Sequence, residues 1–160
     1  MENNRKVEVV LLIGLQGAGK TTFFRHNFAD THQHISKDNF RNAANREKRQ
    51  LHLLNEALEQ QQSVVIDNTN PTAESRAAII ELARRHGARV IGYYFQSQVQ
   101  ACLERNAGRE GKARVPDVAI FATAANMVLP RYDEGFDRLF YVRQADGGSF
   151  EILEWQIDNE

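Results

Sequence analysis

The stretch from Val7 to Thr22, VEVVLLIGLQGAGKTT, decides the fold of this chain. Its apolar, β-branched run stops at Gly14, and the pattern G-x-x-x-x-G-K-[ST] follows, ending with Lys20 and Thr21. This is the P-loop pattern in its meaningful context, behind a buried strand and ahead of a helix. The glycines let successive backbone N–H groups face a phosphate, and the following helix directs its dipole at the same anion.

The P-loop predicts that the chain binds a nucleoside triphosphate. Lys20 is expected to reach the β- and γ-phosphates, and the Thr21 hydroxyl is expected to bind Mg²⁺. A glycine-rich turn that binds nothing is the alternative, which the matched fixed positions and the flanking pattern disfavour. The predicted nucleotide-binding residues of this stretch are Gly14, Gly17, Ala18, Gly19, Lys20, Thr21 and Thr22.

Length and composition indicate one domain in the cytoplasm. The 160 residues, taken as a single domain over 1–160, are enough for a proper hydrophobic core. The net charge of −1 excludes a uniformly basic nucleic-acid-binding surface, so any site for a polyanion must be local. Cys102 has no cysteine partner in the chain, which suits a reducing compartment, and its apolar pattern predicts a packed thiol. The N-terminus shows no apolar signal region, and no stretch approaches membrane-spanning length.

Apolar runs alternate with helical patterns, which predicts a doubly wound, three-layer α/β fold with a mostly parallel sheet. Asn70 and Pro71 are expected to start one helix as its N-cap and first residue, and Ser97 is expected to cap another. A last strand is expected after the turn at 146–148, antiparallel at the sheet edge. The predicted strands are 7–13, 32–35, 63–67, 89–95, 138–143 and one from 150, and the predicted helices run to about 28, over 41–62, 71–86, from 98, and over 117–128.

Two carboxylates follow strand ends, where α/β sheets of this kind bind their ligands. Asp38 could accept the proton of an incoming hydroxyl as a general base, or it could cap a helix, and its spacing leaves both roles open. Asp67 ends the apolar strand VVID and is expected to hold Mg²⁺, directly or through its waters. A capping role for Asp67 is less favoured because Asn70 is expected to fill it.

The segment 105–116, RNAGREGKARVP, has two glycines and four cations and is predicted to be a mobile lid. Arg105 and Arg109 are four residues apart, so on a helix both would lie on one face. They are expected to close over a triphosphate, neutralise the developing charge and exclude water. A solvated basic turn is the alternative. His32 and His34 alternate along a short strand, where they are expected to face solvent rather than to bind a metal as a pair.

Together these motifs resemble the polynucleotide 5′-kinases, the kinase half of the nucleic-acid end-healing kinase–phosphatases. The resemblance runs from about Val9 to Val142, and its P-loop is shared with many NTPases. Its more specific motifs are Lys37-Asp38-x-x-Arg41, Ile66-Asp67-Asn68-Thr69-Asn70-Pro71, Arg105-Asn106-x-x-Arg109 with Lys112 and Val115-Pro116, and Glu134-Gly135-Phe136.

The resemblance implies a P-loop kinase fold and an ATP- and Mg²⁺-dependent transfer to the 5′-hydroxyl of a DNA or RNA end. It implies that Asp38 activates that hydroxyl and that Arg41 grips the phosphate next to it. Arg105 and Arg109 would be lid residues that clasp ATP. The expected catalytic residues are Lys20, Asp38, Arg105 and Arg109, and the expected substrate-binding residues are Asp38 and Arg41. ATP is expected to be bound by the P-loop together with Arg105 and Arg109, and the metal by Thr21 and Asp67.

Two alternatives to this activity stay open. The first is a kinase of a small metabolite on the same scaffold, such as a sugar, a nucleoside or a sugar nucleotide. The second is a non-enzymatic nucleotide switch. The chain lacks the Asp-x-Asp-Gly-Thr phosphatase signature found in many members of the family, so no 3′-phosphatase activity is expected.

Overall fold

The computed structural model describes residues 6–96 and 98–155, over which strands and helices alternate. Ser97, the expected helix cap, and the N-terminal residues 1–5 lie outside the described residues. The strands are β1 (Glu8–Ile13), β2 (Gln33–Ile35), β3 (Val64–Asp67), β4 (Arg89–Phe95), β5 (Arg138–Gln144) and β6 (Phe150–Glu154). The helices are α1 (Lys20–Asn27), α2 (Arg46–Glu59), α3 (Ala73–Arg85), α4 (Val99–Ala107) and α5 (Asp117–Asn126), and the 3₁₀ segments are η1 (Lys37–Phe40), η2 (Gly111–Ala113), η3 (Tyr132–Glu134) and η4 (Asp146–Gly148).

The strands form one six-stranded sheet in the order β2-β3-β1-β4-β5-β6. Neighbouring strands from β2 to β5 are parallel, and β6 pairs antiparallel with β5, with Val142 opposite Ile152. The predicted α/β class, with a mostly parallel sheet and an antiparallel edge strand, is confirmed. Strand β1 lies between β3 and β4, so later strands are added to the sheet on both sides of it. In sheets of this kind a crevice opens at the carboxyl end of the central strand.

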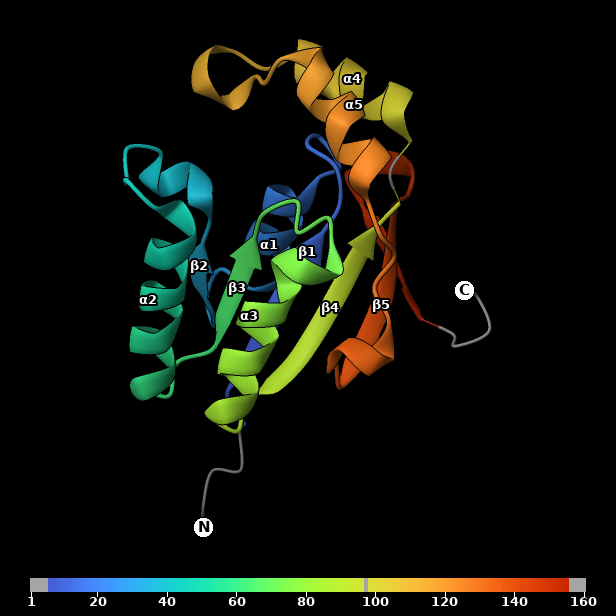
Figure 1. Ribbon diagram of the computed structural model, residues 1–160. Helices are drawn as coiled ribbons and strands as arrows, with labels where there is room; N and C mark the ends of the chain where they lie inside the picture. Colours follow the sequence, from blue (N-terminus) through green and yellow to red (C-terminus); the bar gives the residue numbers. More distant parts are fainter. Residues whose placement is uncertain (1–5, 97, 156–160) are drawn as a thin grey trace.

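Helices cover both faces of the sheet, and β1 is buried between them (Figure 1). Successive side chains of a strand point to opposite faces. Val9 and Leu11 pack in the cluster that includes α2 and α3, whereas Val10 and Leu12 pack with Phe23 of α1 and residues of α4 and α5. This burial on two faces explains the continuous apolar run before the P-loop. None of the described helices combines the length and apolar character needed to cross a membrane.

Asn70 does not cap α3, contrary to the prediction. The N-cap is Thr72, whose hydroxyl oxygen accepts from the Ser75 N–H at 3.0 Å within a capping box. Asn70 instead has a left-handed backbone with a φ of 46°, and its buried side chain donates to the Leu12 carbonyl oxygen at 2.7 Å. A buried carbonyl at the end of β1 needs a donor, and this demand outweighs the local preference of asparagine for a helix cap.

The predicted helix over 41–62 is shorter than expected. It begins at Arg46, after Asn45 accepts a hydrogen bond from the Lys48 N–H at 3.0 Å and caps α2. The residues before it form η1, which places Asp38 and Arg41 beside the crevice instead of on the side of a long helix.

Candidate active site

The P-loop connects β1 to α1 in a conformation that requires glycine. Gly17 and Gly19 have φ values of 82° and 97°, in the left-handed region where a side chain is unfavourable. A Cβ on Gly17 would also lie 2.8 Å from the carbonyl oxygen of Cys102, so the loop packs directly against α4. The Gly14 N–H donates to the Thr69 carbonyl oxygen at 3.1 Å and fixes the start of the loop to the segment after β3.

Lys20 holds its ammonium group inside this loop and is 8% exposed. Its Nζ donates to the carbonyl oxygens of Gly14 at 2.9 Å and Leu15 at 2.7 Å. An ammonium has three N–H donors, so a third can point at a phosphate. Burial lowers the pKa of Lys20 from 10.5 to about 8, although the nearby Asp67 carboxylate acts to raise it.

This pKa predicts that nucleotide affinity falls as the pH rises above about 8. The free protein loses the Lys20 proton there, whereas a bound phosphate favours the charged ammonium and raises its pKa. Between the pKa of the free protein and that of the complex, each pH unit is expected to weaken binding up to about tenfold. The measurement is a calorimetric titration with ADP in EDTA between pH 6.5 and 9.5. Lys20→Met should bind more weakly and without this pH dependence, and a flat wild-type profile would contradict the prediction.

Asp67 lies at the end of β3 beside Thr21, and it is 5% exposed. Its Oδ2 accepts hydrogen bonds from the Thr21 Oγ1 and the His34 Nε2, both at 2.8 Å. Burial acts to raise the pKa of Asp67, but the His34 hydrogen bond, the Lys20 charge and the Thr21 hydrogen bond outweigh it and hold the pKa below its ordinary value. Asp67 is therefore an ionised carboxylate, and it does not cap α3.

The pair of Thr21 and Asp67 fits the predicted metal. Mg²⁺ takes hard oxygen ligands and is usually held by one or two carboxylates together with substrate phosphates. A hydroxyl and an ionised carboxylate in hydrogen-bonding contact supply oxygens of this kind. Over residues 6–96 and 98–155, no three His, Cys, Asp or Glu side chains are grouped so that they could hold a metal by themselves. A metal here would thus depend on phosphate oxygens as well.

The two histidines near β2 do not face solvent, contrary to the prediction. The side chain of His32 is 9% exposed and that of His34 is 26% exposed. His32 Nε2 lies 2.8 Å from Glu8 Oε1, and the His34 ring stacks on Phe24 with 4.3 Å between centroids. Their acidic partners lie on other strands, so the strand order had to be known before these contacts could be found. His34 is a site residue that sequence reasoning missed, since it orients Asp67.

Asp38 lies on η1 and Arg41 directly follows it, and Ser36 caps η1 by accepting the Asp38 N–H at 3.3 Å. The Asp38 carboxylate is therefore not the cap, and its side chain is 74% exposed. Its Oδ1 lies 3.5 Å from Arg41 Nη2, which also donates to the Lys112 carbonyl oxygen at 3.0 Å. Arg41 thus connects η1 to the lid. A role of Asp38 as general base stays a prediction.

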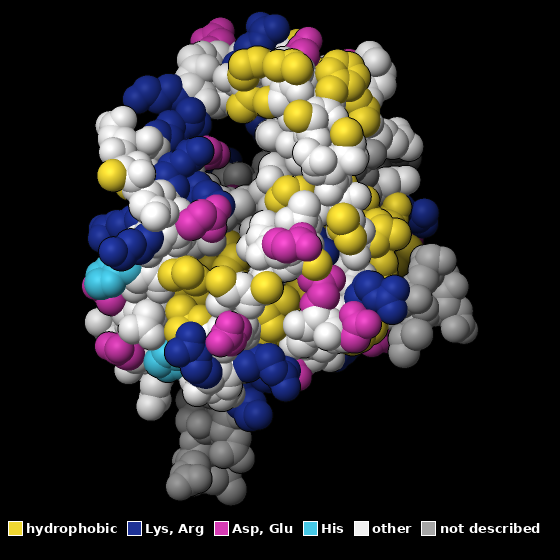
Figure 2. All heavy atoms as spheres, in the orientation of Figure 1, with side chains coloured by type: hydrophobic (Ala, Val, Ile, Leu, Met, Phe, Trp, Pro, Cys, Tyr) yellow, Lys and Arg dark blue, Asp and Glu magenta, His cyan; other side chains and the backbone are white. Residues whose placement is uncertain are grey.

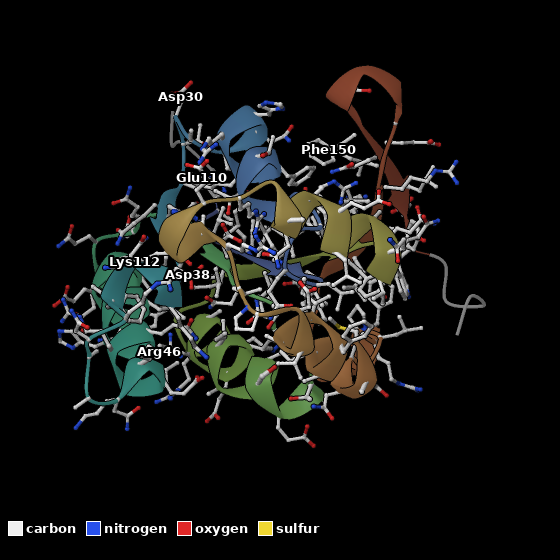
Figure 3. All side chains as sticks on the ribbon, turned by 90° about the horizontal axis from the view of Figure 1, so that it is seen from above. Asp30, Asp38, Arg46, Glu110, Lys112 and Phe150 are labelled. Atoms are coloured by element: carbon white, nitrogen blue, oxygen red, sulfur yellow. The ribbon has the colours of Figure 1, made fainter. Side chains whose placement is uncertain are left out.

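A cavity of about 360 Å³ lies where the P-loop, η1, the segment after β3 and the lid meet. Figure 2 shows a hollow with Lys and Arg side chains gathered beside it, and Figure 3 shows Asp38 and Arg46 on the η1–α2 side. One carboxylate, that of Asp38, lines the cavity against five cations, which are Lys20, Lys37, Arg41, Arg46 and Arg109. This local excess of positive charge suits a polyanionic ligand, although the chain as a whole is nearly neutral.

The two lid arginines do not share one helix face, contrary to the prediction. Helix α4 ends at Ala107, so Arg109 lies beyond the helix, and it lines the cavity. Arg105 is outside the lining of the cavity. Its Nη1 donates to the Gly17 carbonyl oxygen at 2.6 Å and its Nη2 contacts Gln144 Oε1. Arg105 therefore supports the P-loop from outside the cavity lining, whereas Arg109 lies in the lining.

The predicted site residues thus divide into two groups. One group lines the cavity: Gly17, Gly19, Lys20, Thr21, Asp38, Arg41 and Arg109. The other group lies outside the lining: Gly14, Ala18, Thr22, Asp67 and Arg105. Sequence reasoning missed Lys37 and Arg46 as lining residues, because a charged residue near a helix start is normally a solvated one.

Two amide side chains close the loops around the cavity. Asn106 is fully buried, accepts from the Val115 N–H at 2.9 Å and donates to the Val115 carbonyl oxygen at 2.7 Å. It therefore fixes the base of the lid. Asn68 accepts from the Lys37 N–H at 2.9 Å and fixes η1 to the segment after β3. Both belong to motifs that carried the resemblance, but no spacing in the sequence indicated what they bind.

Comparison with known proteins agrees with this geometry. A family model described as "AAA domain" matches residues 9–130. A bifunctional polynucleotide phosphatase/kinase of Schizosaccharomyces pombe is 28% identical over 133 residues, which are 81% of this chain and 32% of that protein. The chain thus spans about a third of the length of this curated relative. These matches confirm the resemblance indicated by the motifs.

Solved structures share the fold at lower identity. A fungal RNA kinase aligns with a TM-score of 0.67 at 19% identity, covering 90% of this chain and 40% of that chain. A gluconokinase from Sinorhizobium meliloti aligns with a TM-score of 0.62 at 19% identity, covering 88% of this chain and 84% of that chain.

Proposed function

The chain belongs to the AAA domain family as a P-loop kinase domain, and we propose that it transfers the γ-phosphate of ATP to the 5′-hydroxyl of a DNA or RNA end. One observation carries the proposal. Asp38 and Arg41 line the same cavity as Lys20 and Thr21 of the P-loop, which supports their assignment as the general base and the cation for the acceptor phosphate. The curated relative, which is named a bifunctional polynucleotide phosphatase/kinase, supports this choice of acceptor.

In this mechanism each residue acts by position and charge, which supply most of the rate in phosphoryl transfer. The P-loop N–H groups and Lys20 bind the β- and γ-phosphates, and Arg109 neutralises the charge that develops on the transferred group. Asp38 accepts the proton of the attacking hydroxyl, while Arg41 holds the phosphate next to it. Arg105 keeps the P-loop in shape through the Gly17 carbonyl. Mg²⁺ held by Thr21 and Asp67 would add neutralisation of the phosphate oxygens.

Arg41→Ala is expected to raise the KM for a 5′-hydroxyl oligonucleotide by about 10- to 100-fold, the size of one lost charge-assisted hydrogen bond. The KM for ATP should stay near the wild-type value because Arg41 contacts the acceptor side of the cavity. Steady-state kinetics with each substrate varied in turn make the measurement. Arg114→Ala removes an exposed lid cation outside the cavity lining and is the matched control. An unchanged acceptor KM in Arg41→Ala would contradict the assignment.

A kinase of a small metabolite is the second candidate. The alignment with gluconokinase spans most of both chains, and a cavity of about 360 Å³ falls in the range of small-molecule sites. The experiment that separates the candidates is one transfer assay with labelled ATP. Its acceptors are 5′-hydroxyl DNA, 5′-hydroxyl RNA, a 3′-mononucleotide and gluconate. Label only on the sugar would favour the second candidate, and label on no acceptor would favour a nucleotide switch.

A further inference from the structure

Arg46 is the cavity cation that the proposed mechanism leaves without a role. Lys20 and Arg109 are assigned to the nucleotide and Arg41 to the acceptor phosphate. Lys37 forms an ion pair with Glu47, which offsets its charge. Arg46 lines the same cavity, yet in the described part of the chain no carboxylate lies within ion-pairing distance of it.

The stability of α2 does not explain this cation. Arg46 is the first residue of the helix, and Lys48 and Arg49 follow in the same turn. The N-terminus of a helix carries partial positive charge, so cations there are unfavourable and acids are favourable. The one acid of this turn, Glu47, is engaged with Lys37. A local choice that opposes helix stability is typical of a functional position.

The placement of Arg46 indicates what it binds. Asp38 lies on η1, Arg41 follows three residues later, and Arg46 begins α2 five residues after that, so one short stretch of the chain contributes all three to the cavity lining. Figure 3 shows Asp38 and Arg46 on this side of the molecule. A nucleic-acid strand whose 5′-hydroxyl reaches Asp38 and whose first phosphate reaches Arg41 would continue along this stretch. The next anionic group of such a strand is its second phosphate. An arginine suits it because the guanidinium can donate two parallel N–H bonds to phosphate oxygens.

We infer that Arg46 binds the second phosphate of the acceptor, counted from the 5′-hydroxyl, and thereby makes the site select a strand over a mononucleotide. This inference rests on the proposed function. A 3′-mononucleotide carries the phosphate for Arg41 but none for Arg46, so the two acceptors differ in the contact made by Arg46.

The test combines a change in the protein with a change in the acceptor. The acceptor is a 5′-hydroxyl tetranucleotide in which one of its three linkages is replaced by an uncharged methylphosphonate. We expect neutralisation of the second linkage to lower kcat/KM of the wild type by about tenfold or more, the size of a charge-assisted hydrogen bond. Arg46→Gln should lose about as much on the unmodified strand, and almost nothing further when the second linkage is also neutral.

Three controls make the result specific. Arg49→Ala removes the same charge from the same helix turn outside the cavity lining, so it should keep both the activity and the sensitivity to the second linkage. Neutralisation of the third linkage should change kcat/KM less than about twofold, as expected for a phosphate without a fixed contact. In Arg46→Gln the ratio of kcat/KM on the tetranucleotide to kcat/KM on a 3′-mononucleotide should fall by about tenfold, and a circular dichroism spectrum like that of the wild type would report correct folding.

The outcomes separate this inference from the proposed function. If the wild type phosphorylates the tetranucleotide but Arg46→Gln retains full sensitivity to the second linkage, the role of Arg46 is wrong and the kinase proposal stands. Equal activity of Arg46→Gln and the wild type on the unmodified strand has the same meaning. If the wild type transfers no phosphate to any 5′-hydroxyl strand, the proposed function fails and the inference fails with it.

Discussion

Asp38→Asn is expected to lower kcat for phosphoryl transfer by about 10²- to 10⁴-fold, the usual contribution of a general base. Asparagine has the same shape but cannot take the proton of the attacking hydroxyl. The Asp38 side chain is 74% exposed and does not cap η1, so the substitution removes no contact on which the fold depends. The affinity for ATP should stay near the wild-type value because the P-loop binds the nucleotide.

The measurement is single-turnover transfer from labelled ATP to a 5′-hydroxyl oligonucleotide, with ATP binding followed by calorimetry. Asp30→Asn is the matched control, since Asp30 is an exposed aspartate that does not line the cavity (Figure 3). It should retain the wild-type rate. Wild-type turnover in Asp38→Asn would remove Asp38 from the mechanism, whereas loss of ATP binding would show that its role is not specific to the acceptor.

Arg76→Met is expected to destabilise the fold by about 3–5 kcal/mol, because it leaves a largely buried carboxylate without its partner. Arg76 is 0% exposed and donates from Nε and Nη2 to Glu134 at 2.8 Å and 3.1 Å. Its Nη1 donates to the carbonyl oxygens of Asn70 at 2.9 Å and Val128 at 3.1 Å. One side chain therefore links α3, the loop after β3 and the segments on either side of Pro130.

Urea unfolding followed by circular dichroism gives the free energy of unfolding. Arg85→Met changes an exposed arginine of the same helix and is expected to stay within about 0.5 kcal/mol of the wild type. The double variant Arg76→Met/Glu134→Gln should recover part of the loss, since it removes the unpaired charge. A loss below about 1 kcal/mol in Arg76→Met would contradict the assigned cost of the unpaired carboxylate.

The parts of the site that the sequence predicted lie within single short stretches. Around the P-loop, the strand, the turn and the start of the helix follow one another along the chain. The β-branched residues indicate the strand, the glycines indicate the turn, and the Lys20-Thr21 pair indicates the start of the helix. Asp67 could be placed at the carboxyl end of a strand because VVID is apolar until its last residue. The order of strands and helices along the chain then predicted the parallel sheet.

The lid differs from the prediction made from helical spacing. The sequence indicated a glycine-rich, basic segment, but the helical spacing of Arg105 and Arg109 suggested one shared face. Helix α4 ends at Ala107, before Arg109, so Arg105 binds the Gly17 carbonyl from outside the cavity lining and Arg109 lies in the lining. A helix end in a polar segment leaves a weak signal, and its exact position decides where each following side chain points.

The sequence by itself determined the fold class and the nucleotide-binding loop. Both depend on the backbone preferences and the burial of single segments, which the apolar periodicity and the position of the glycines indicate directly. The tertiary structure alone decided that His34 bonds to Asp67 across 33 residues and that Arg105 bonds to Gly17 across 88. It also decided that the Asn70 side chain donates to the Leu12 carbonyl oxygen of β1 instead of capping a helix. Such contacts depend on which strands become neighbours in the sheet. The apolar pattern of one segment indicates which of its faces is buried, but not which other segment packs against that face.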